Sequence, residues 1–118
     1  MMKTRILLAI TFLVGCSPNW HEYPYEVYWI NGNKTLGYSL GNGSYMARVD
    51  SPQQISTNEN YIAVYACPEN LCSYYYIDKQ LDHKFAGHDE FVFGPFSLEQ
   101  YEQLSIEIQL PDVSKFKI

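Results

Sequence analysis

The chain lacks a hydrophobic run long enough to cross a membrane as a helix. Its longest apolar stretch extends from Ile6 to Val14 and is interrupted by Thr11, whereas a spanning helix needs roughly 20 apolar residues. This shortage argues against a transmembrane anchor. A short apolar run that follows Lys3 and Arg5 has instead the order of a secretory signal peptide.

Basic residues are also scarce. Eight Lys and Arg residues stand against 13 Asp and Glu residues, and the formal net charge is −5. Lys3 and Arg5 fall in the expected signal peptide, so residues 16–118 keep six basic residues and a formal charge of −7. Nucleic acids and anionic lipid headgroups are bound by patches of Lys and Arg. Neither is therefore an expected partner.

The residue patterns of known metal sites are missing. Potential ligands gather between Asp78 and Glu90, including His83 and His88. They show neither the alternating oxygen ligands and sharp glycine turn of a calcium site nor the His pairs of a zinc site. We expect a solvated acidic loop here, with no metal and no cofactor.

No pattern of catalytic residues stands out either. Ser44 follows Gly41-Asn42-Gly43, but the Gly-x-Ser-x-Gly pattern is absent and these residues favour a turn. Glu99 and Glu102 fall on the polar side of a predicted helix, and one small sheet with one helix offers little cleft for a hydrolase. The sequence predicts that the protein is not an enzyme, and an envelope hydrolase is the least favoured alternative.

The apolar run ends in Leu13-Val14-Gly15-Cys16, which resembles the lipobox of bacterial lipoproteins. The resemblance implies that residues 1–15 are removed as a signal peptide and that Cys16 carries a diacylglycerol and an acylated amino terminus. Three acyl chains exceed the two signals that stable membrane anchoring requires. By the sorting preference of Gram-negative lipoproteins, Ser17 favours the outer membrane. A plain secretory peptide cut elsewhere is the alternative.

Removal of residues 1–15 from the 118-residue chain leaves 103 residues, which suffices for one domain. Pro18 and Pro24 oppose regular structure, so residues 16–24 are expected to be a lipidated tether and residues 25–118 a single small β-rich domain. Eleven tyrosines and only 18% charged residues favour β-structure.

Two further cysteines, Cys67 and Cys72, enclose a four-residue loop. An oxidising periplasm or cell surface would join them, and such a bridge stabilises by roughly 2 kcal/mol in the chain-entropy model. A redox pair is less favoured because the spacing exceeds Cys-x-x-Cys.

Two dipeptides, Asn31-Gly32 and Asn42-Gly43, are typical of two-residue hairpin turns. Both turns predict registers that place Leu36 on the same face, opposite Val27 in one hairpin and Val49 in the other. The result is a three-stranded meander with Arg48 on its wet side. Its apolar face would consist of Tyr25, Val27, Trp29, Leu36, Tyr38, Leu40, Tyr45, Ala47 and Val49.

A second hairpin is predicted over residues 61–67 and 72–78, with Ile62 opposite Ile77 and Tyr65 opposite Tyr74. One side of this hairpin is apolar, and the other gathers tyrosines. This tyrosine face, defined as Tyr61, Tyr65, Tyr74 and Tyr76, is either an exposed binding surface or is covered by a helix or a second sheet layer.

The end of the chain predicts one helix. Ser97 and Gln100 match a capping box, apolar residues from Leu98 to Ile108 recur at helical spacing, and Pro111 ends the pattern. Before the helix, residues 80–90 are expected to be loop and residues 91–93 a short strand that ends at Gly94-Pro95.

Residues 74–79, Tyr-Tyr-Tyr-Ile-Asp-Lys, and the later Gly-Pro-Phe-Ser at 94–97 resemble a pattern of small uncharacterised bacterial lipoproteins. The resemblance implies a fold and no activity. Together these patterns predict an α+β protein with an antiparallel meander of about six or seven strands and one C-terminal amphipathic helix.

For function, we expect a membrane-anchored module of the bacterial envelope that binds another envelope protein. An immunity or phage-exclusion lipoprotein that occludes its target is the sharper expectation. An accessory subunit of an envelope assembly or secretion machine is the alternative within the binding class.

Overall fold

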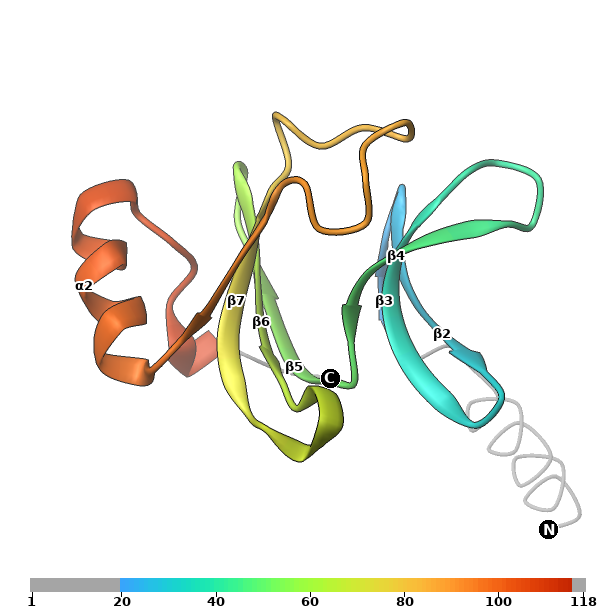
Figure 1. The fold of residues 1–118 in the computed structure, drawn as a ribbon. Coiled ribbons are helices and arrows are strands. Elements are labelled where there is room, and N and C mark those ends of the chain that lie inside the picture. The colour runs from blue at the N-terminus through green and yellow to red at the C-terminus, as the bar shows by residue number, and fades with distance from the viewer. Residues whose placement is uncertain (1–19, 116–118) are drawn as a thin grey trace, which may run out of the picture.

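The computed structural model describes residues 20–115, so the lipobox, Cys16 and Ser17 lie outside the described residues. It contains two four-stranded antiparallel sheets and a C-terminal helix (Figure 1). The α+β class is confirmed, whereas the single meander of six or seven strands is wrong, because the described residues form eight strands. Sheet A consists of β1 (His21–Glu22), β2 (Tyr25–Ile30), β3 (Asn33–Ser39) and β4 (Tyr45–Asp50). Sheet B consists of β5 (Pro52–Thr57), β6 (Tyr61–Ala66), β7 (Ser73–Asp78) and β8 (Val92–Phe96).

The two sheets bury a shared core between them. It includes Val27, Leu36 and Val49 from sheet A and Ile62 and Ile77 from sheet B. Helix α2 (Leu98–Ile108) lies on the opposite face of sheet B, which gives three layers (Figure 1). The strands divide into two sheets at Ser51, the one residue between β4 and β5, which has a φ of 54°. Such a short, sharply turned link carries the chain from one layer to the next instead of extending the meander.

Both predicted hairpin registers around the core are confirmed. In sheet A, Asn31 and Gly32 have φ values of 54° and 81°, and Val27 lies opposite Leu36. In sheet B, Ile62 lies opposite Ile77. The predicted Cys67–Cys72 disulfide closes the β6–β7 hairpin around the short turn η1 (Pro68–Asn70).

The β3–β4 hairpin differs from the prediction. Its connection is longer than the Asn42-Gly43 turn, since β3 ends at Ser39 and β4 begins at Tyr45. A β-bulge then breaks the register, because Leu36 lies opposite Val49 but Gly37 lies opposite Ala47. Arg48, the extra residue, has no opposite partner in this ladder.

Arg48 and Trp29 of sheet A have environments that the sequence pattern did not predict. Arg48, expected on the wet side, is buried. Trp29, expected in the apolar core, is 61% exposed because it lies beside the Asn31-Gly32 turn, outside the core that the two sheets share.

The predicted helix is confirmed together with its capping box. The Ser97 hydroxyl accepts the Gln100 N–H at 3.1 Å, and the Gln100 side chain accepts the Ser97 N–H at 2.9 Å. Gln109 ends the helix in the left-handed region, and η2 (Val113–Lys115) follows. Strand β8 continues through Gly94-Pro95 to Phe96, contrary to the prediction, because proline is tolerated on an edge strand.

The segment expected to be a tether is partly folded onto sheet A. Residues 21–22 form β1 and pair with Tyr25 and Glu26, and Trp20 packs against the core between the sheets. The folded unit therefore includes Trp20 and β1, ahead of the boundary predicted at residue 25.

Candidate functional site

Helix α2 and the segment that follows it cover much of the tyrosine face. Tyr61, Tyr74 and Tyr76 pack against a second cluster built on buried Ala63, Tyr101 and Leu110, and all three are half-buried. The Tyr74 ring lies 5.4 Å from that of Tyr101, and burial raises the pKa of the Tyr74 hydroxyl. These three tyrosines therefore contribute to the packing of α2 on sheet B and are only partly exposed to solvent.

Tyr65 lies at the edge of this second cluster. Its ring centroid is 4.9 Å from that of Tyr74, and on its other side Tyr65 is paired with Gln54 of β5. Tyr61, Tyr74 and Tyr76 pack directly against the second cluster, whereas Tyr65 is connected to it through Tyr74.

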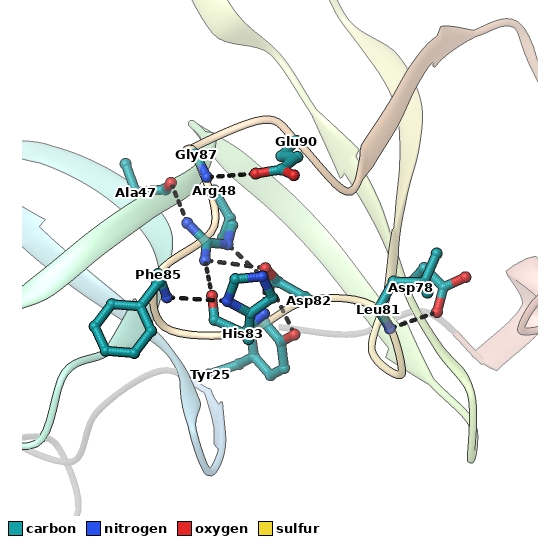
Figure 2. A network of polar contacts seen from close by, with 10 residues as sticks. All are labelled: Tyr25, Ala47, Arg48, Asp78, Leu81, Asp82, His83, Phe85, Gly87 and Glu90. Carbon is teal, nitrogen blue, oxygen red and sulfur yellow. Dashed lines mark hydrogen bonds and ion pairs between the residues drawn. The ribbon is translucent and has the colours of Figure 1, made fainter.

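The structure brings together a different group of polar residues that sequence reasoning did not connect. Residues 79–91, here called the cross-sheet loop, leave β7 of sheet B and cross over to sheet A before returning to β8 (Figure 1). Within it, Asp82 meets Arg48 of β4 and Tyr25 of β2 (Figure 2). We call Tyr25, Arg48 and Asp82 the buried polar cluster.

Both carboxylate oxygens of Asp82 accept two hydrogen bonds in this position. Its Oδ2 accepts Nε–H of Arg48 at 2.8 Å and the Tyr25 hydroxyl at 2.9 Å. Its Oδ1 accepts Nη2–H of Arg48 at 3.0 Å and the His83 backbone N–H at 2.9 Å. The carboxylate thus uses all of its approximately four acceptor positions, and the guanidinium binds it in a bidentate manner.

The ion pair is almost completely removed from solvent, with side-chain exposures of 1% for Arg48 and 0% for Asp82. Arg48 also donates to the His83 carbonyl at 3.0 Å and lies over the Tyr38 ring at 5.2 Å. Burial, then the charge of Asp82, raises the pKa of the Tyr25 hydroxyl far above its usual value, so this group stays a hydrogen-bond donor. The expectation of a wholly solvated acidic loop was wrong at Asp82, because its partner Arg48 lies 34 residues away in the chain.

The buried polar cluster holds a loop whose tip is exposed. Phe85 is 83% exposed, although Asp82 before it and Ala86 after it are buried. Its backbone N–H donates to Nδ1 of His83 at 3.2 Å, and Lys84 Nζ lies 5.4 Å from its ring centroid. Figure 2 shows the Phe85 ring pointing away from the cluster. The loop therefore presents a large aromatic side chain to solvent from a fixed backbone.

The described residues give little further indication of a metal site or of a pocket for a small ligand. Residues 20–115 contain no group of three His, Cys, Asp or Glu residues placed to hold a metal ion. A hollow of about 410 Å³ on sheet A is open and lined by a mixture of side chains such as Tyr28, Lys34 and Asp50. Among the described residues, no helix combines the length and the apolar character needed to span a bilayer.

Comparisons with known proteins add no relative: no family model, no curated protein and no solved structure matches the chain. The chain's own residues are therefore the basis for assigning a function.

We predict that Asp82→Asn destabilises the domain by about 3–5 kcal/mol, because it leaves the Arg48 charge buried without a counter-ion. The melting temperature should fall by more than about 10 °C, and trypsin should cleave after Lys84 much faster. The double variant Arg48→Met with Asp82→Leu should recover part of this stability, since it buries no unpaired charge, although the Tyr25 hydroxyl and the His83 N–H lose their acceptor. A melting temperature of Asp82→Asn equal to that of the wild type would contradict the buried pair.

Tyr74 and Tyr65 of the tyrosine face should respond differently to truncation. We predict a loss of about 3 kcal/mol for Tyr74→Ser, whose ring packs against Tyr101 in the second cluster, and a loss of about 1 kcal/mol or less for Tyr65→Ser. Circular dichroism melts of the two single variants measure this difference. Equal, small losses would mean that α2 does not cover this face.

Proposed function

We propose that this protein is a lipid-anchored module of the bacterial envelope that binds another envelope protein, of the kind that occludes its target, as immunity and phage-exclusion lipoproteins do. The observation that carries the proposal is the exposed Phe85 on a loop fixed by a buried ion pair. The lipobox-like Leu13-Val14-Gly15-Cys16 supports an envelope location, and Ser17 favours the outer membrane.

The exposed Phe85 ring has the form of an interface anchor. Interface hot spots are large side chains that enter pockets of a partner, and a rigid presentation reduces the entropy lost on binding. The Phe85 ring has the size and exposure for this role, and the buried polar cluster supplies the rigidity. Lys84 and His83 flank it with donor groups on a chain that is acidic overall, so the matching partner surface is an apolar pocket with acidic groups at its rim.

Membrane attachment can be tested at the proposed acylation site. Cys16→Ala should abolish palmitate labelling and release the protein from the membrane fraction, because no acyl chain can then be added. The matched control is the double variant Cys67→Ala with Cys72→Ala, which removes the other two cysteines and should remain labelled. Labelling that persists in Cys16→Ala would overturn the anchor.

Partner binding can be tested at Phe85 in the full lipidated chain. A photoreactive phenylalanine at position 85 should crosslink in cells to one discrete envelope protein, and capture of that protein should fall about tenfold in Phe85→Ser, the loss of about 1.4 kcal/mol expected for a hot-spot residue. The control carries the same probe at Ile106, which is 77% exposed on α2. An absence of adducts at position 85, or the same adducts from both positions, would contradict the proposal.

A further inference from the structure

Two hairpin turns lie at the same end of the molecule, opposite the cross-sheet loop (Figure 1). They are the Asn31-Gly32 turn of sheet A and the disulfide-closed turn of sheet B. Backbone bonds connect them through Ser51, whose N–H donates to the Lys34 carbonyl at 2.9 Å and whose carbonyl accepts the Cys67 N–H at 3.0 Å. We call this region the hairpin end.

Each of the two hairpins exposes a large apolar side chain at or beside its turn. Trp29 is 61% exposed and Leu71 is 72% exposed. Lys34 lies opposite Trp29 in the β2–β3 ladder, with its Nζ 5.9 Å from the Trp29 ring. Tryptophan is enriched where membrane and water meet, since its ring is apolar and its N–H polar, and a lysine beside it can extend its charged group to the aqueous side.

The chain enters the fold in a direction that points back to the hairpin end. Strand β1 runs antiparallel to β2, and the Trp20 carbonyl accepts the Val27 N–H at 3.0 Å. Going backwards along the chain from Glu22 to Trp20 therefore follows β2 toward the Asn31-Gly32 turn. Cys16 stands four residues before Trp20, and four residues span at most about 14 Å.

We propose that the hairpin end docks on the bilayer that holds the lipid anchor, with Trp29 and Leu71 at the level of the headgroups. This inference rests on the anchor at Cys16. The end carries Lys34 together with Asp50 and Glu69, so apolar insertion rather than attraction to anionic lipids drives the contact. The covalent anchor keeps the hairpin end close to the bilayer at a high effective concentration, so two apolar side chains are enough to hold it there. Docking in this orientation directs Phe85 away from the membrane.

The chain has two tryptophans, Trp20 and Trp29, which permits a direct test by fluorescence. In the lipidated Trp20→Phe variant, Trp29 is the sole reporter. We expect phosphatidylcholine vesicles with brominated acyl chains to quench most of its emission, compared with unbrominated vesicles. The matched control carries Trp20→Phe, Trp29→Phe and Phe85→Trp, so its reporter lies at the opposite end, and its emission should not change.

A second comparison protects the test if Trp20→Phe unfolds the domain, since Trp20 packs against the core. The wild type and Trp29→Phe, both with Trp20 intact, should then differ in quenching by the contribution of Trp29. Equal quenching of the two would overturn the docking.

The remaining outcomes separate the docking from the anchor. If the protein floats with the vesicles but Trp29 is not quenched, the docking is wrong and the anchor stands. If Trp29 is shielded from acrylamide in water but not quenched by brominated lipid, a protein surface covers it, and the docking is again wrong. If the protein does not float with the vesicles at all, the anchor fails and the docking fails with it.

Discussion

The ion pair between Arg48 and Asp82 is the contact on which the arrangement of the two sheets with the cross-sheet loop depends. It joins β4 of sheet A to a loop that belongs, by chain connectivity, to sheet B. Removing two charges from water costs several kcal/mol per ion, and this cost is offset only where geometry and further hydrogen bonds are favourable. Here Tyr25 and the His83 backbone supply those bonds. An apolar pair could stabilise as well, but it would lack the directional hydrogen bonds that hold the loop here.

The two ends of the molecule have different surfaces. At one end, the buried polar cluster holds the backbone on both sides of Phe85 and leaves its ring in solvent. At the other end, Trp29 and Leu71 lie at or beside two hairpin turns. Backbone hydrogen bonds from Ser51 to Lys34 and from Cys67 to Ser51 connect the two hairpins. A domain tethered near the second end would present the first to a partner. Helix α2 occupies a third face, where it converts most of the tyrosine face into a second small core.

Local signals in the sequence were accurate where local chemistry decides the structure. The Asn31-Gly32 turn, the Ser97–Gln100 capping box and the Cys67–Cys72 bridge each depend on residues a few positions apart, and each was predicted. The prediction of the β3–β4 turn was wrong, because Gly41 and Gly43, rather than Asn42 and Gly43, have positive φ values. The bulge beside Gly37 was not predicted either, although an isolated glycine inside a strand often marks such a site.

The sequence by itself determined the strand-rich class, two hairpin registers, the disulfide and the helix, because alternation, turn residues and caps act over short distances. Only the tertiary structure decided that the strands form two sheets, that Arg48 turns inward and that Asp82 is buried. Those outcomes arise from contacts between segments far apart in the chain, where a charged residue has the same local pattern whether water or a distant partner satisfies it. For the same reason, the exposure of Phe85 and Trp29 depends on which other side chains form the core.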